Sequence, residues 1–260
     1  MKIDYCFHTH TYRCGHAFGE DASFVQAALA QGMKELGFSD HVFLPGRPQP
    51  GIRGDYQLLG DYINSINSLK KKYAKEINIH LGFECEYFPE YVEYYRELKS
   101  KHHIEYLILG QHCFYDKEGF HWYLYENCPY ERIKRYTDDL IKGMETGLFS
   151  YVAHPDIFVT PFRTFTMGCE ECARRICKAA ERLHIPLEIN LGMTVAVLFN
   201  DYNGLTYPNE DFWRIASEYK IEVYVGADAH RPEYFRTVDY ERALNLIEKH
   251  HLKLLTRLKK

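Results

Sequence analysis

The sequence lacks the features that would indicate a membrane protein or a nucleic-acid-binding protein. No apolar stretch approaches the roughly 20 residues that cross a bilayer as a helix. The formal net charge is −4, so the chain has no excess of basic residues with which to bind nucleic acid. From Met1 to Tyr5 the chain runs directly into a predicted strand. We therefore expect a cytoplasmic protein with neither a membrane nor a nucleic-acid partner.

The cysteines do not form a recognisable disulfide or zinc pattern. The eight cysteines are scattered, and several lie in apolar runs where a free thiol packs as a small apolar group. Cys169 and Cys172 have the C-x-x-C spacing, with Cys177 following, but no second such pair exists. Because this segment has an amphipathic helical pattern, we interpret the three as helix residues rather than zinc ligands.

No linker divides the chain. Short apolar runs alternate with helical patterns along all 260 residues, as in repeated βα units around a parallel sheet. The predicted strands are Lys2–His8, Lys34–Phe38, Asn78–Phe83, Tyr106–Gly110, Tyr151–Ala153, Pro186–Asn190 and Glu222–Gly226. The predicted helices are 21–33, Tyr56–Lys75, Pro89–Lys101, Tyr130–Glu145, Cys169–Leu183, Asn209–Tyr219 and Asp239–Lys249. These units predict one α/β domain, residues 1–260, forming a closed or nearly closed barrel; an open doubly wound sheet is the alternative.

Histidines mark the end of the first predicted strand. Alternation along the strand sends His8 and His10 to the same face, so both can bind one ion. His16 follows in the same loop. In a parallel barrel the carboxyl ends of all strands lie on one face, so ligands distant in the sequence converge there.

Five later strand ends carry the same residue types. The further candidate ligands are His41, Glu84, His112, His154, Asp228 and His230. Only the strand ending at Asn190 offers neither an imidazole nor a charged ligand. The other histidines lie at strand starts, in helices, in a long loop or in the tail, and receive no metal role: His80, His102, His103, His121, His184, His250 and His251. The sequence therefore predicts a metal cluster at one end of the barrel.

The ordered motifs resemble those of the PHP (polymerase and histidinol phosphatase) superfamily. They are HxH at 8–10, SDH at 39–41, GFE at 82–84, GQH at 110–112, AHPD at 153–156 and DAH at 228–230. The segments GFECEY, LEINLG and LTYP resemble the histidinol-phosphatase branch. The resemblance covers nearly the whole chain and implies a distorted (β/α)7 TIM-like barrel that holds three divalent metal ions.

The resemblance also implies which side chains hold each ion. The first ion would be bound by His8, His10, Glu84 and Asp228. Glu84 would bridge to the second ion, which His112 and His154 complete. The third would be bound by His16, His41 and His230. Because imidazoles with few carboxylates suit zinc, iron or manganese, we expect two to three such ions.

The expected activity is hydrolysis of a small phosphate monoester by metal-activated water, most specifically of L-histidinol phosphate to L-histidinol and phosphate. The sequence has no nucleophile elbow, P-loop or cysteine-phosphatase loop, so no side-chain nucleophile is expected. Glu84 would bridge the ions. Asp228 and His230 would assist proton transfer to the leaving alkoxide.

Residues near the expected cluster are candidates for supporting roles. Asp40 and Asp156 either orient ligand imidazoles or cap loops. The candidate phosphate-binding arginines are Arg163 and Arg231, with Arg13, Arg47 and Arg53 as weaker candidates. The segments Phe43–Asp55 and Phe114–Tyr130 are expected to wall the site. Candidates for contacting a cationic end of the substrate are Asp116, Glu118, Tyr115 and Trp122.

Two alternatives stay open. The first is a PHP-type phosphatase or phosphodiesterase that acts on a nucleotide or sugar phosphate with the same ligands and different loops. The second is a non-catalytic, metal-stabilised binding barrel. The oligomeric state is not predicted.

Overall fold

The computed structural model describes residues 2–125, 128–193 and 204–259. Its main sheet has the strand order β1-β2-β3-β4-β7-β8-β9-β10, and these strands pair in parallel. The strands are β1 (Tyr5–Cys6), β2 (Glu35–His41), β3 (Asn78–Cys85), β4 (Tyr106–Leu109), β7 (Tyr151–Val152), β8 (Leu187–Asn190), β9 (Glu222–Gly226) and β10 (Lys253–Leu254). Each successive strand of this sheet is added next to the preceding one, so the strand order does not reverse as it does in a doubly wound sheet. The predicted distorted TIM-like α/β barrel is confirmed.

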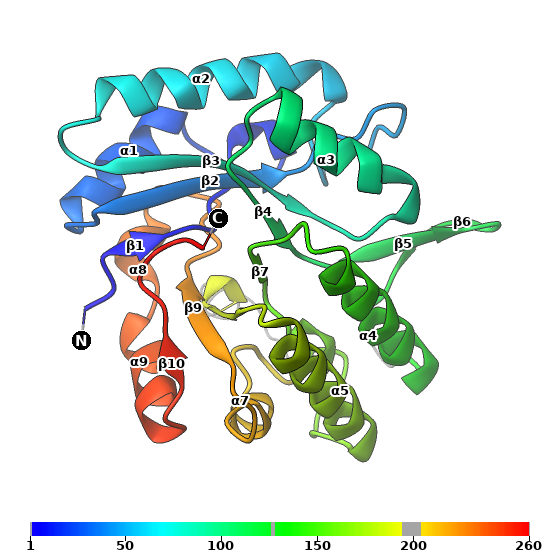
Figure 1. Cartoon of the computed structure of the whole chain (residues 1–260). Coiled ribbons are helices and arrows are strands. Elements are labelled where there is room, and N and C mark those ends of the chain that lie inside the picture. Colours follow the sequence, from blue (N-terminus) through cyan, green and yellow to red (C-terminus); the bar gives the residue numbers. More distant parts are fainter. Residues whose placement is uncertain (1, 126–127, 194–203, 260) are drawn as a thin grey trace.

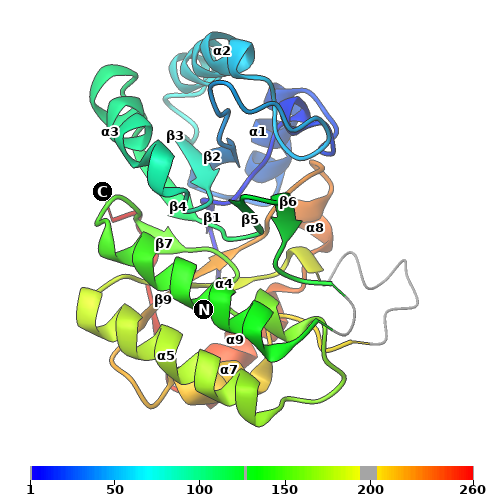
Figure 2. The same ribbon diagram turned by 90° about the vertical axis from the view of Figure 1, so that its right-hand side faces the viewer.

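Helices cover the outside of the curved sheet (Figures 1 and 2). They are α1 (Asp21–Ala30), α2 (Leu59–Lys72), α3 (Val92–Lys101), α4 (Tyr130–Glu145), α5 (Met167–Leu183), α7 (Glu210–Ala216), α8 (Tyr234–Thr237) and α9 (Tyr240–Lys249). Side-chain caps fix several helix starts, because Thr166, Asn209 and Asp239 each accept a hydrogen bond from a backbone N–H three residues later. Most of these helices match predicted ones, whereas the short α8 was not predicted.

Backbone pairing between the first and the last predicted units closes the ring at the carboxyl end. Thr9 and Ala229 form a parallel bridge. The N–H of His10 donates to the Ala229 carbonyl at 2.9 Å, and the N–H of Ala229 donates to the His8 carbonyl at 3.1 Å. The HxH and DAH motifs are thereby held against each other, although more than 200 residues separate them.

The structure differs from the sequence prediction in several places, and the first strand spans only Tyr5–Cys6 rather than Lys2–His8. Strands β2 and β3 continue to His41 and Cys85, so His41 and Glu84 lie within strands rather than after them. Strand β10 adds a short eighth member to the sheet. The segment after His112 forms an antiparallel hairpin of β5 (Cys113–Asp116) and β6 (Gly119–Trp122), whose turn uses Gly119 at φ 116°.

Tyrosines fill the barrel below the candidate ligands. The hydroxyls of Tyr106 and Tyr151 both donate to the carbonyl of Phe7, at 2.8 and 3.1 Å. Tyr5 stacks on Phe7, and Tyr224 packs edge-on against both rings. These large side chains are almost completely buried, and their hydroxyl groups form hydrogen bonds. They form a closely packed layer beneath the candidate ligands, which restrains the positions of the ligands.

The buried apolar side chains of the strands and the helices belong to one hydrophobic cluster. A single domain over residues 1–260 stays a prediction. Within the described ranges, no helix has the length and apolar character needed to traverse a lipid bilayer.

Candidate metal centre

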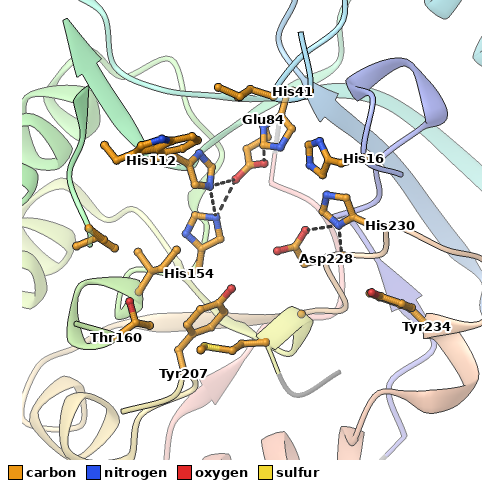
Figure 3. Close-up of a pocket in the computed structure, with 17 residues that line it drawn as sticks. His16, His41, Glu84, His112, His154, Thr160, Tyr207, Asp228, His230 and Tyr234 are labelled. Carbon is orange, nitrogen blue, oxygen red and sulfur yellow. Dashed lines mark hydrogen bonds and ion pairs between the residues drawn. The ribbon is translucent and has the colours of Figure 1, made fainter. Parts of the chain in front are cut away.

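The carboxyl end of the barrel brings all nine predicted ligands into one region, and Figure 3 shows all of them except His8 and His10 around a cavity. Strand β1 leads directly into His8 and His10, while His16 follows the short 3-10 helix Tyr12–Cys14. His41 and Glu84 are register partners on β2 and β3. The strand-end convergence expected from the sequence is therefore present in the geometry.

Glu84 faces the first and second groups of ligands with different carboxylate oxygens, and its Oε2 also lies 3.2 Å from Nδ1 of His41. Its Oε2 lies 3.4 Å from Nε2 of both His8 and His10. Its Oε1 lies 2.9 Å from Nε2 of His154 and 3.6 Å from Nε2 of His112. This is the arrangement required of a carboxylate that bridges two ions.

Asp228 completes the first group. Its Oδ1 is 3.4 Å from His8 Nε2 and 3.1 Å from His10 Nε2. His8, His10, Glu84 and Asp228 thus point four donor atoms at a common position. The second group consists of Glu84, His112 and His154, whose donor atoms lie within 4.8 Å of one another.

A third group consists of His16, His41 and His230. The ring of His230 stacks on those of His10 and His16, with centroids 4.0 and 4.7 Å away. Its Nδ1 is 3.0 Å from the carbonyl of Asp228, so a proton on Nδ1 leaves Nε2 as the free lone pair.

Unsatisfied buried atoms show that these side chains fit metal ions. Among the candidate ligands, seven buried side-chain atoms have no hydrogen-bond partner in the described part of the chain: His8 Nε2, His10 Nδ1, His10 Nε2, His41 Nδ1, His154 Nδ1, Asp228 Oδ1 and His230 Nε2. Leaving such atoms unpaired is costly unless another group, such as a cation, binds them. Imidazole nitrogens and carboxylate oxygens are the donors that zinc, iron and manganese accept.

The carboxylates carry the negative charge of the centre. Burial opposes ionisation, but the adjacent imidazoles outweigh it and hold the pKa of Glu84 and Asp228 well below the ordinary range. Burial also opposes a charge on His8, yet Asp228, Glu188 and Glu84 raise its pKa well above the ordinary value. A divalent ion bound here would displace that proton.

The third group is electrostatically different. Burial, together with neighbouring His10, lowers the pKa of His16 and lowers that of His230 to about 3. Burial lowers the pKa of His41 well below its ordinary value. These imidazoles are therefore neutral near pH 7, which is the form that binds a metal ion.

Three buried carboxylates lie beside the ligand rings, and only Asp40 was predicted from the sequence. Asp40 lies 3.6 Å from Nδ1 of His10 and accepts from the backbone N–H of His41. Glu86 lies 3.1 Å from Nδ1 of His112, and Glu188 lies 3.0 Å from Nδ1 of His8. For Glu188 a signal was available, because it is a glutamate within the predicted apolar strand Pro186–Asn190 and a buried charge requires a partner.

Asp156, the other candidate for orienting a ligand, has a capping role instead. Its Oδ2 accepts from the backbone N–H of Asn209 at 2.7 Å and from Trp213 Nε1 at 3.1 Å. Burial raises the pKa of Asp156 to about 7. Nδ1 of His154 has no hydrogen-bond partner among the described residues.

The backbone around the ligands is unusual. His154 and Asp228 have φ angles of 29° and 49°, which non-glycine residues rarely adopt. Such conformations persist where the surrounding structure enforces them, often at functional sites. Gly110 lies beside Glu84, and a Cβ at residue 110 would collide with the Glu84 carboxylate. Glycine is thus required for the close approach of Glu84 to this strand end.

A cavity of about 690 Å³ opens in front of the three groups. Both predicted wall segments contribute to it, through Gly51 and Ile52 and through Trp122 and Leu124; residues 126–127 of the second segment lie outside the described residues. The remaining described lining that is not a metal-ligand candidate comprises Ile157, Thr160, Gly192, Met193, Tyr207 and Tyr234.

The predicted phosphate-binding arginines are not among the lining residues. Arg163 is exposed, and the guanidinium of Arg231 lies 4.4 Å from the ring centre of Phe18. Arg13 and Arg53 are buried in ion pairs with carboxylates. No arginine or lysine lines the cavity in the described ranges. Phosphate binding by Arg163 and Arg231 stays a prediction.

Of the four residues expected at the cationic end of the substrate, one lines the cavity. Trp122 does so, whereas Asp116 lies at the hairpin with His121 at 3.0 Å and Arg135 at 3.5 Å. Tyr115 packs against Arg47, and Glu118 is exposed in the turn. The described cavity wall is therefore apolar and aromatic apart from the ligands and Thr160.

The fold and the site define a TIM-like barrel protein with clustered side chains that could hold metal ions. The chain belongs to the PHP domain family, whose model matches residues 7–192. It is 27% identical over 235 residues to a probable histidinol-phosphatase of Deinococcus radiodurans, covering 86% of this chain and 85% of that protein. It is 30% identical over 90 residues to the histidinol-phosphatase of Bacillus subtilis, covering 32% and 34% of the two chains.

A solved structure supports the fold assignment. Histidinol phosphate phosphatase from Lactococcus lactis, crystallised with zinc, L-histidinol and phosphate, superposes with a TM-score of 0.74 at 18% identity and covers 99% of both chains. The similarity extends over the whole barrel rather than over a single motif.

Proposed function

We propose that the protein is a metal-dependent phosphoesterase that hydrolyses L-histidinol phosphate to L-histidinol and phosphate. The observation that carries this proposal is Glu84, which directs one oxygen to His8 and His10 and the other toward His154. The substrate is proposed from the names of the Deinococcus, Bacillus and Lactococcus proteins. We further propose two to three zinc, iron or manganese ions as cofactors.

Each group of side chains has a distinct part in the proposed reaction. Divalent ions at these positions would lower the pKa of a water molecule for attack on phosphorus and neutralise charge on the phosphoryl oxygens. Asp228 would bind an ion in the first group, and Glu84 would bind ions in the first and second groups. Asp228 and His230 lie at the cavity and would assist proton transfer to the departing alkoxide oxygen. Because no lysine or arginine lines the described cavity wall, the metal ions would neutralise most of the negative charge of the phosphate.

The cellular compartment is proposed from the state of the cysteine side chains. All eight cysteines are free and buried, as expected for a protein of a reducing compartment. We propose a cytoplasmic enzyme that acts on a small phosphorylated molecule.

The aromatic wall suits a leaving group that carries a flat or cationic ring. Trp122, Tyr207 and Tyr234 line the cavity, and such faces attract cations as well as apolar rings. Tyr207 lies beside the second group, with its ring 6.1 Å from that of His154. Figure 3 shows its hydroxyl directed toward the ligands. We therefore assign Tyr207 a contact with the bound phosphate ester.

Tyr207→Phe tests this contact, because it removes the hydroxyl and keeps the ring. A neutral hydrogen bond contributes about 1 kcal/mol, so we expect kcat/KM to fall roughly 3- to 10-fold with unchanged metal content. Steady-state kinetics and elemental analysis make the comparison. Tyr12→Phe is the control, since Tyr12 is exposed and lies outside the lining. If both variants have the same kcat/KM, the proposed contact between the Tyr207 hydroxyl and the substrate is wrong.

A panel of phosphate esters tests the substrate. We expect the metal-loaded protein to release phosphate from L-histidinol phosphate with a kcat/KM about 10-fold or more above those for sugar phosphates and nucleotides. Phosphate release at defined zinc, iron or manganese loading is the measurement. Faster hydrolysis of a nucleotide, sugar phosphate or phosphodiester would favour the first alternative and leave the metal centre standing. Metal binding without hydrolysis of any ester would favour a binding barrel.

A further inference from the structure

We propose that Glu188 is a positioning residue that couples the first and second ion sites; this rests on the proposed metal centre. Glu188 lies on β8, between Leu187 and Ile189, and its side chain is fully buried. It belongs to none of the three ligand groups. It instead holds one residue from each of the first two groups.

Three donors converge on the Glu188 carboxylate. Nδ1 of His8 is 3.0 Å from both oxygens. The backbone N–H of His154 donates to Oε2 at 3.2 Å, and Nδ2 of Asn190 donates to the same oxygen at 2.8 Å. His8 belongs to the first group and His154 to the second. One carboxylate therefore fixes a ring in one site and the backbone in the next.

The hydrogen-bond chemistry favours a carboxylate at this position. An ionised carboxylate only accepts, so it keeps a proton on His8 Nδ1 and leaves Nε2 to face Glu84 and Asp228, each 3.4 Å away. It also restrains His154, whose φ of 29° requires support from its surroundings. A glutamine amide would turn an NH2 group toward at least one of the three donors.

The neighbouring strand makes room for this carboxylate. Gly226, at the end of β9, faces Glu188, and a Cβ at residue 226 would collide with the Glu188 carboxylate. Asn190 extends the contact, because its Nδ2 also lies 3.4 Å from Oδ2 of Asp228. The strand that lacked a predicted ligand thus supplies the link between ligands.

Glu86 provides a matched comparison. It is also a buried glutamate, in the segment directly after β3, and its Oε1 lies 3.1 Å from Nδ1 of His112. Its other oxygen accepts from Arg53 at 2.7 Å. Glu86 therefore contacts a ligand of the second group alone, so loss of its charge acts on one site.

The test compares Glu188→Gln with Glu86→Gln and the wild type by zinc titration against a chromophoric chelator. The metal-free full-length proteins are first compared by circular dichroism. We expect Glu188→Gln to weaken two zinc sites by roughly 10- to 100-fold and Glu86→Gln to weaken one. In NMR spectra of the zinc-loaded protein, we expect the hydrogen-bonded Nδ1–H signal of His8 to shift in Glu188→Gln and to persist in Glu86→Gln.

The outcomes are separable. Wild-type zinc affinities in Glu188→Gln, or weakening of one site only, would overturn the coupling by Glu188. If that variant does not fold, Gly226→Ala is titrated instead, and unchanged binding there contradicts the proposal equally. A wild-type protein that binds no zinc, iron or manganese would instead refute the metal centre and with it the proposed function.

Discussion

Replacing Glu84 by glutamine is expected to abolish most of the activity and to release metal. The substitution keeps the shape of the side chain but replaces one of the two oxygens that face different ligand groups with an NH2 group. An amide nitrogen does not bind a metal ion, so the bridge is lost. We expect kcat/KM to fall about 1,000-fold or more, equivalent to about 4 kcal/mol of transition-state stabilisation, and bound metal to drop by at least one ion per chain.

Glu35→Gln is the matched control for this experiment. Glu35 lies on the adjacent strand β2 at the opposite end of the barrel, where it pairs with His80 at 2.9 Å. Loss of that carboxylate removes a charge from the sheet without touching the centre, so metal content and kcat/KM should stay at wild-type values. If Glu84→Gln keeps both its metal and its activity, the bridging role is wrong.

Metal removal is expected to have the second large effect. A ligand at 100 times its dissociation constant stabilises the native state by about 2.7 kcal/mol, so two ions contribute about 5 kcal/mol. For a chain of this size that corresponds to a fall in Tm of roughly 10–20 °C on chelation. Hydrolysis should stop as well, and both properties should return on addition of zinc, iron or manganese.

Differential scanning calorimetry and phosphate release, measured on the same chelated and reloaded samples, check this prediction. Magnesium provides the control ion, since imidazole-rich sites bind it weakly. Unchanged Tm and full activity after exhaustive dialysis against chelator would contradict a role for the ions. Recovery of Tm without recovery of activity would support a metal-stabilised barrel that only binds its ligand.

The strand-end ligands were predictable because parallel topology converts sequence order into position. His8 and His10 alternate on one strand, and the carboxyl ends of the other strands meet them on the same face. The barrel followed from the same alternation of strands and helices, and the sequential strand order confirms it. A ligand could therefore be predicted from the sequence wherever it lies at the end of a predicted strand.

The residues that orient the ligands were harder to predict because their role depends on contacts across strands. Glu188 is separated from His8 by 180 residues, and only the curvature of the sheet brings them within 3.0 Å. The same holds for loop residues. Asp116 contacts His121 across the β5–β6 hairpin, and Arg231 packs on Phe18. Both contacts depend on loop conformation, which the periodicity of the strands does not predict.

Anomalous diffraction at the zinc edge from crystals of the zinc-loaded protein tests directly whether Glu84 bridges two ions. We expect one peak in contact with His8, His10 and Asp228 and a second in contact with His112 and His154, with one oxygen of Glu84 bound to each. A single zinc ion at this end of the barrel, or peaks that do not contact Glu84, would contradict it.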